Sequence, residues 1–212
     1  MPLIETTTAT ENYRERCEDR VTVFNDTDRT VIVVADGAGG IGSGDLAAEA
    51  VIRAIAEEHP SVHSADDWAK LLKQIDCQIT AGESTAVVVD IRPYGIAGAS
   101  VGDSQAWVIS DGKIHDLTAA QNRKPLLGSG LTNAVAFTHP PLNGLMIVAT
   151  DGFYNYAKRD EIARLASESD YYEICRRCIE LVRLPSGELW DDVGIVVARN
   201  KPNYRTRQIY EI

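Results

Sequence analysis

Three apolar segments of the chain begin or end at aspartate, and this pattern constrains the fold more than any other feature. The segments are residues 31–35 before Asp36-Gly37, residues 145–150 before Asp151-Gly152, and residues 193–198 after Asp191-Asp192. Each segment is typical of a buried strand, and the glycines predict that the chain turns directly after the first two aspartates. Carboxylates at the rims of buried strands need solvent, a partner or a cation. We therefore expect the three rims to share one cation site.

The length and charge of the chain exclude several classes of protein. A chain of 212 residues is long enough for one domain with a sizeable core, so we expect a single domain over 1–212, with a core of 10–200 and a polar tail at 200–212. The net charge of −10 argues against a nucleic-acid partner. No segment reaches the roughly 20 apolar residues of a membrane span. Residues 1–10 lack the basic and apolar regions of a signal peptide, so a cytoplasmic protein is expected.

Strands and helices are predicted in groups and do not alternate. Strands are expected at residues 21–24, 30–35, 85–91, 94–100, 105–110, 113–115, 145–149 and 193–198, and helices at 45–58, 65–79, 159–167 and 171–182. Residues 118–143 have weak periodicity and are predicted to form a surface loop. This grouping favours an α+β fold, in which two mainly antiparallel sheets are each covered by a helix pair.

Two motifs match phosphate-handling sites but lack the structural context that those sites need. Residues 37–42 match the dinucleotide pattern G-x-G-x-x-G. Asp36 would place a negative charge beside the pyrophosphate, and a second helix follows the first where a strand is required. Residues 26–30 match the D-x-D-x-T of aspartate-nucleophile phosphatases, but another strand follows at once, so a hairpin turn explains them better.

The aspartates at the strand ends suit a particular class of cation. Carboxylate oxygens are hard ligands, which favours Mg²⁺ or Mn²⁺ over zinc. Three or more carboxylates can hold two ions about 3.5–4 Å apart, where a bridging water becomes hydroxide and a phosphoryl group under attack is neutralised. Gly37 leaves room for its carbonyl to be a ligand, and Asp103, after another apolar strand, is a candidate for a further ion. The alternative is that each aspartate is an ordinary turn or cap residue, which does not require the same arrangement three times.

Six short motifs, in order along nearly the whole chain, resemble those of the metal-dependent protein Ser/Thr phosphatases of type 2C, in their bacterial form. The motifs are R-E-R-C-E-D (14–19), D-G-A-G-G (36–40), S-T-A (84–86), G-D-S-Q-A (102–106), T-D-G (150–152) and D-D-V (191–193). Each is weak alone, and their order makes the resemblance specific. It implies a four-layer αββα sandwich with metal ions at one end, between the sheets.

The resemblance also implies an activity and a set of site residues. The activity is hydrolysis of phosphoserine and phosphothreonine in proteins by a hydroxide bridging two Mn²⁺ or Mg²⁺ ions, without a phosphoenzyme, on substrates supplied by a cognate Ser/Thr kinase. The residues implied are Asp36, Gly37, Asp151 and Asp191 for the two ions, Asp103 for a third, Glu18 acting through metal-bound water, and Arg14 for the substrate phosphate.

Several positions depart from the family pattern. Ala38 replaces a histidine that some eukaryotic members use as general acid, so water would have to protonate the leaving group. Asn155 replaces a third-metal aspartate of many members, which leaves the third ion open. Cys17, Gln105 and Asp192 replace Asn, Arg and Asn of the motifs. These changes motivate an alternative, a pseudophosphatase that acts as a regulatory binding module. A phosphoesterase of small molecules is a third possibility.

Overall fold

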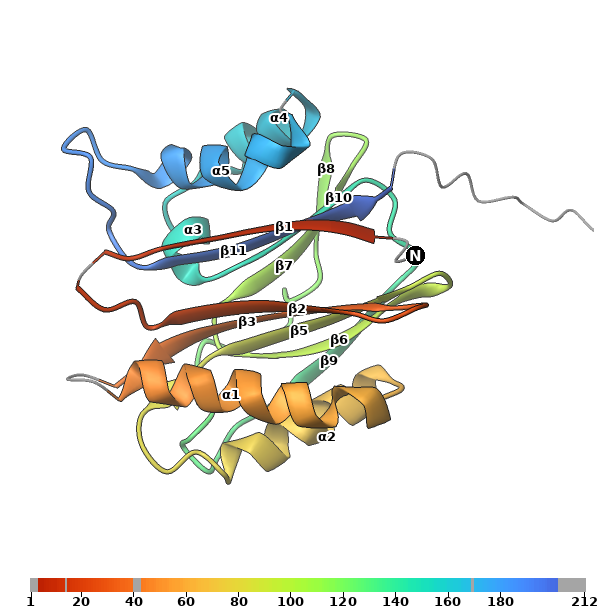
Figure 1. Ribbon diagram of the computed structural model, residues 1–212, viewed down its shortest axis with the longest axis vertical. Helices are drawn as coiled ribbons and strands as arrows, with labels where there is room; N and C mark the ends of the chain where they lie inside the picture. The colour runs from red at the N-terminus through yellow and green to blue at the C-terminus, as the bar shows by residue number, and fades with distance from the viewer. Residues whose placement is uncertain (1–3, 14, 40–42, 169, 202–212) are drawn as a thin grey trace, which may run out of the picture.

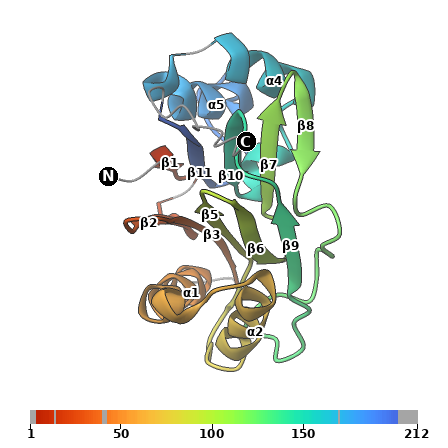
Figure 2. The ribbon, with the colours of Figure 1, turned by 90° about the vertical axis from the view of Figure 1, so that its right-hand side faces the viewer.

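The computed structural model describes residues 4–13, 15–39, 43–168 and 170–201 and contains two antiparallel sheets packed face to face (Figure 2). The first sheet has the order β1 (Ile4–Glu11), β11 (Val193–Asn200), β10 (Leu145–Ala149), β7 (Gln105–Ser110) and β8 (Lys113–Asp116). The second has the order β2 (Asp19–Asn25), β3 (Thr30–Ala38), β5 (Ala86–Arg92), β6 (Gly95–Val101) and β9 (Val135–His139), with β4 (Glu83–Ser84) paired to β3.

Helices cover the outer face of each sheet, which confirms the predicted four-layer α+β sandwich (Figure 1). The second sheet carries α1 (Gly44–Glu58) and α2 (Ala65–Asp76), and the first carries α4 (Arg159–Glu168) and α5 (Ile174–Val182). One-turn helix α3 (Asp151–Tyr154) follows β10, and 3₁₀ turns lie at His59–Ser61 and Tyr171–Glu173. No helix in the described ranges is long and apolar enough to cross a membrane.

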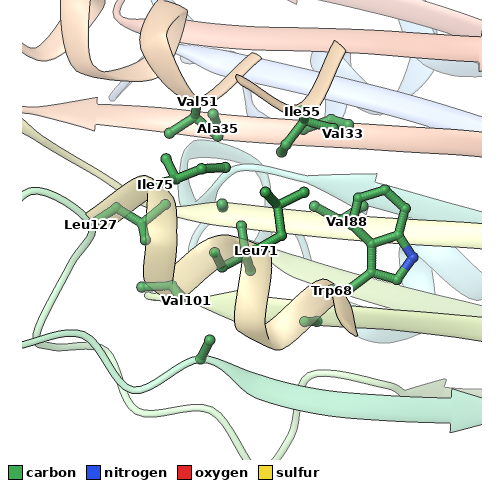
Figure 3. Close-up of a cluster of buried hydrophobic side chains, with 14 of the residues drawn as sticks. Val33, Ala35, Val51, Ile55, Trp68, Leu71, Ile75, Val88, Val101 and Leu127 are labelled. Carbon is green, nitrogen blue, oxygen red and sulfur yellow. The ribbon is translucent and has the colours of Figure 1, made fainter. Parts of the chain in front are cut away.

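The central strands are apolar on both faces because both faces are buried, as the continuous apolar run of residues 31–35 predicts. Val33 and Ala35 of β3 pack toward the helices, whereas Ile32 and Val34 pack between the sheets. Figure 3 shows the helix side of this core, with Val51 and Ile55 of α1 and Trp68, Leu71 and Ile75 of α2 on the sheet. These rigid layers fix where each strand ends, and so position the site.

The structure corrects three local expectations. The turn predicted directly after Asp36 is wrong, because β3 continues through Gly37 and Ala38, which pair with β4. After Asp151 the chain enters helix α3. The loop expected over residues 118–143 contains β9, a five-residue edge strand of half-buried side chains whose short apolar pattern was too weak to indicate a strand.

The threonine-rich N-terminal segment forms strand β1, which was not expected either. All eight residues of β1 pair with β11 at the edge of the first sheet. β-Branched side chains such as threonine favour strands. Because the edge strand is only partly buried, the segment lacks the strong hydrophobic alternation that marks an ordinary strand.

Candidate metal centre

Three aspartates from distant parts of the chain meet at one end of the sandwich, where β3 ends and α3 begins (Figure 1). Asp36 lies in β3, Asp103 in the turn between β6 and β7, and Asp151 at the first position of α3. One carboxylate oxygen from each lies within 4.8 Å of the others. The sequence predicted that Asp36, Asp151 and Asp191 would share one site; the structure brings Asp36 and Asp151 together, with Asp103 as the third member of the cluster.

Asp191 lies beside this group and outside it. Its side chain is exposed and does not belong to the 4.8 Å cluster. Its negative charge nevertheless contributes to raising the pKa of both Asp36 and Asp151. Asp191 therefore acts on the electrostatics of the cluster from its rim.

The backbone of Asp36 is held by the S-T-A motif. The Asp36 N–H donates to Thr85 Oγ1 at 3.0 Å, and the Thr85 N–H donates to the Asp36 carbonyl at 2.8 Å. Ser84 Oγ donates to the same carbonyl at 3.1 Å. The buried Thr85 hydroxyl also lies 2.7 Å from the hydroxyl of Ser104, the neighbour of Asp103. The motif thus couples the positions of Asp36 and Asp103 through hydrogen bonds.

Gly37 lies where backbone packs directly against backbone. A Cβ at Gly37 would lie only 2.2 Å from the carbonyl oxygen of Gly44, at the start of α1. The Gly37 N–H donates to the Glu18 carbonyl at 3.3 Å. The Glu18 carboxylate lies against Gly44, because a Cβ there would be 2.8 Å from Glu18 Oε2. Glu18 and Gly37 are therefore neighbours beside the aspartate cluster.

Asp19 is a member of the site that the sequence analysis did not single out. It is 2% exposed, faces Asp36 directly across the β2–β3 ladder, and accepts a hydrogen bond from Thr150 Oγ1 at 2.7 Å. The signal was present in the predicted hairpin: Asn25 pairs with Thr30 across the turn, and counting outward from that pair places residue 19 opposite residue 36.

Burial and mutual repulsion make the ionised cluster unfavourable. Burial, and next the charge of Asp19, raise the pKa of Asp36 to about 10. Burial raises the pKa of Asp19 to about 7 despite the hydrogen bond from Thr150, and burial together with Asp103 raises the pKa of Asp151. Like charges placed directly across a ladder are destabilising. An all-oxygen set of crowded carboxylates fits a hard divalent cation, which would remove this repulsion.

Two hydrogen-bond donors lie on the Asp103 side of the cluster. Arg123, from the segment between β8 and β9, places Nε 2.5 Å from Asp103 Oδ2 and a terminal nitrogen 3.8 Å from Asp151 Oδ2. The Asn155 side-chain amide donates to Asp151 Oδ2 at 2.9 Å. Arg123 gave no sequence signal, because it lies in a stretch without periodicity and reaches the site through long-range contacts.

Asp192, which replaces an asparagine of the family motif, holds the segment before β2. Its two carboxylate oxygens accept the backbone N–H of Tyr13 at 2.7 Å and of Glu18 at 2.6 Å. The predicted phosphate-binding residue of this segment, Arg14, lies outside the described residues. Asp192 therefore anchors the segment on which Glu18 lies, and its second oxygen allows it to accept both bonds.

Comparison with known proteins gives one family. The family described as Protein phosphatase 2C matches residues 8–183 of this chain. A curated relative, the serine/threonine phosphatase stp of Listeria welshimeri, is 28% identical over an alignment of 153 residues, and the match covers 63% of this chain and 61% of the relative. The chain thus spans about three fifths of the length of that relative.

Solved structures share the fold over nearly all of the chain. A bacterial serine phosphatase bearing an R161E mutation matches with a TM-score of 0.81 and 22% identity, covering 95% of this chain and 99% of that one. Serine/threonine phosphatase Stp1 from Staphylococcus aureus matches with a TM-score of 0.79 and 21% identity, covering 95% and 96%. At these identities the likeness concerns the fold alone.

Proposed function

The chain belongs to the protein phosphatase 2C family, and we propose that it hydrolyses phosphoserine and phosphothreonine in proteins with Mn²⁺ or Mg²⁺ as cofactor. The observation that carries the proposal is the cluster of Asp36, Asp103 and Asp151, whose carboxylate oxygens lie within 4.8 Å of one another. Such a half-buried set of like charges favours a counter-ion, and divalent ions are the cofactors that make phosphate esters reactive.

In this proposal Asp36 and Asp151 hold the ions through carboxylate oxygens, Gly37 through its carbonyl, and Asp191 from the rim. Asp103 would bind a third ion. Glu18 and Asp19 lie beside Gly37 and Asp36 and would accept hydrogen bonds from water bound to the ions. Bound ions would supply a water of lowered pKa and positive charge for the phosphoryl oxygens.

The chain's own groups would bind and orient the substrate. We assign Arg14 to the substrate phosphate, because a guanidinium matches phosphate oxygens in two parallel hydrogen bonds. Ala38, next to Gly37, offers no acid, so the leaving serine or threonine oxygen would take its proton from solvent. The rigid support of Asp36 by Ser84 and Thr85 keeps the ligand oxygens in place without reorganisation during the reaction.

The proposal is tested with a phosphothreonine peptide, Mn²⁺ and two variants. Asp36→Asn should lose turnover, whereas Asp111→Asn should retain it, because Asp111 is an exposed residue of the β7–β8 hairpin turn. EDTA should abolish wild-type activity and Mn²⁺ should restore it. Full activity of Asp36→Asn, or activity in EDTA, would contradict the proposal.

Calorimetry with Mn²⁺ and a comparison of substrates separate the alternatives. Mn²⁺ binding in calorimetry without turnover on any phosphopeptide would favour the regulatory binding module. Faster hydrolysis of nucleotides than of phosphopeptides would favour a small-molecule phosphoesterase. If phosphopeptides are the substrate, we infer that a Ser/Thr kinase supplies them, in the cytoplasm.

A further inference from the structure

We propose that Arg123, whose side chain is 74% exposed, is a counter-ion supplied by the chain itself, which lies on the Asp103 side of the centre and competes there with a third divalent ion. The inference rests on the metal centre of the proposed function. It assigns a role to a side chain that belongs to none of the six motifs. Two ions would then remain on the Asp36 side, and the Asp103 side would be filled by the protein itself.

The contacts of Arg123 are those of a counter-ion. Its Nε lies 2.5 Å from Asp103 Oδ2, and a terminal nitrogen lies 3.8 Å from Asp151 Oδ2, so one guanidinium faces two members of the cluster. Among the ion pairs of the described residues, none reaches Asp36 or Asp19. Among the described residues, the ion pairs with the cluster are therefore made on the side of Asp103 and Asp151.

The segment that carries Arg123 is tied down on both sides of it. Before Arg123, the Gln121 side chain accepts a hydrogen bond from Ser100 Oγ at 3.2 Å and donates one to the Asn133 carbonyl at 3.2 Å. After Arg123, Leu127 exchanges two backbone hydrogen bonds of 3.0 Å with Ser84, next to the Thr85 that holds Asp36. These ties bring residue 123 to the cluster.

A buried carboxylate fixes the far end of the same segment. Asp76 of α2 is 4% exposed and accepts the backbone N–H groups of Gly128 at 2.7 Å, Gly130 at 3.0 Å and Thr132 at 3.1 Å. Three charge-assisted hydrogen bonds to one carboxylate make a strong anchor. The placement of Arg123 therefore has support from the core.

Asn155 makes the Asp103 side poorer in ligands for an ion. Its amide donates to Asp151 Oδ2 at 2.9 Å, so this oxygen already accepts a hydrogen bond and faces Arg123 as well. An aspartate at position 155 would add a negative ligand, whereas the amide adds none when it points its N–H groups at the carboxylate. Arg123 offsets one of the two negative charges on this side, and Asn155 adds none, so the electrostatic need for a further metal ion is reduced.

Titration of the full chain with Mn²⁺ in calorimetry, with no substrate present, tests the inference. Arg123→Ala should tighten the weakest Mn²⁺ step by up to about fivefold, since a competing, solvent-exposed charged contact is removed. Adding Asp103→Asn to Arg123→Ala should cancel that gain, because the freed ion needs the Asp103 carboxylate. Lys124→Ala, which removes the adjacent positive charge of the same segment, should behave as wild type.

Three outcomes would overturn the inference. If Arg123→Ala and wild type bind Mn²⁺ identically, Arg123 does not compete with an ion, and the proposed function stands. If Mn²⁺ binding is unchanged and the KM for a phosphopeptide rises, Arg123 contacts the substrate phosphate instead. If wild type binds no Mn²⁺ at all, the two-metal function fails as well, so the two failures are distinguishable.

Discussion

The carboxylates at the two ends of the second sheet have opposite charge environments. At the end where β3 begins, Asp90 is fully buried and lies 2.7 Å from Arg29 and 3.0 Å from Arg92. At the end where β3 finishes, Asp19 and Asp36 face each other across the ladder. Asp90 has two arginine counter-ions, whereas no ion pair of the described residues reaches Asp19 or Asp36, whose charge is left to be neutralised from outside.

This difference separates a structural ion network from a site. Arg29 also donates to the carbonyls of His59 and Val62, and Arg92 donates to Val62 as well, so Asp90 sits in a hydrogen-bonded network that ties the start of β3 to the loop between α1 and α2. Removing one partner from such a network leaves an uncompensated buried charge. At the other end, removing one carboxylate relieves repulsion. The comparison predicts opposite signs for mutations of the same residue type.

The largest effect is expected for Asp36→Asn. Activity on a phosphothreonine peptide should fall by about 10³-fold or more, because a ligand of the proposed centre is lost. In EDTA the variant should unfold at a higher temperature than wild type, since asparagine removes a carboxyl whose charged form is disfavoured in the folded chain. Both are measured on the same preparation, by kcat/KM and by thermal unfolding. If Asp36→Asn unfolded at a lower temperature than wild type in EDTA, the predicted difference in sign between the two ends of the sheet would be wrong.

The opposite sign is expected for Asp90→Ala. Loss of this carboxylate leaves Arg29 and Arg92 buried together without their partner, and should lower the free energy of unfolding by about 3–5 kcal/mol. Urea unfolding measures the effect. Activity per folded molecule should remain near wild type, because the centre lies at the other end of the strand. An unchanged unfolding free energy would show that the network is not structural.

We next expect the free energy of unfolding of the metal-free protein to fall as pH rises, and this dependence should change sign when metal is bound. The pKa of Asp19 is about 7 and that of Asp36 about 10 in the folded chain, both above the usual 3.8. The folded state thus holds extra protons. The stability that these protons contribute is fully present below the usual pKa and is lost as pH rises through about 7 and then toward 10.

Chemical unfolding in EDTA across this pH window measures the loss. With saturating Mn²⁺ the slope should change sign, because ions bind the deprotonated carboxylates and stabilise the folded chain. Stability in EDTA that rises with pH through the same window would contradict the assignment of the raised pKa values to Asp19 and Asp36.

The smallest effect is expected for substitutions of Asp192, which anchors the segment that carries Glu18. Asp192→Ala removes the acceptor of two backbone N–H groups and should cost about 1–3 kcal/mol, together with part of the activity. Asp192→Asn, which restores the family residue, keeps one acceptor oxygen and should lie between Asp192→Ala and wild type. Urea unfolding and kcat/KM of the three proteins give the order. Equal values for both variants would show that the second oxygen is unimportant.

Much of the centre was predictable because its residues lie at the ends of strongly apolar strands. Asp36 and Asp151 follow such runs, and the α+β grouping places those runs in facing sheets. The position of Asp19 opposite Asp36 could be predicted by counting along the β2–β3 hairpin from Asn25 and Thr30. The position of Arg123 could not be predicted, because its segment is placed by contacts with Ser84, Ser100 and Asp76. These residues are remote in sequence and lie on other elements.

The sequence pattern missed one edge strand of each sheet. Strands β1 and β9 lie at edges, where side chains are half exposed and the pattern loses its contrast. The continuation of β3 through Gly37 was missed for another reason. Glycine predicts a turn when only local conformation is considered, whereas here it is required by the close approach of α1.

That close approach limits how the chain could diversify or be redesigned. A Cβ at Gly37 would lie 2.2 Å from the Gly44 carbonyl oxygen, and a Cβ at Gly44 would lie 2.8 Å from both Glu18 Oε2 and the Gly37 carbonyl carbon. A substitution at either glycine would move α1 and Glu18 together, so the two positions are interdependent. Libraries built on this scaffold should therefore keep both glycines and vary neighbours such as Ala38, where a new side chain could add the missing acid.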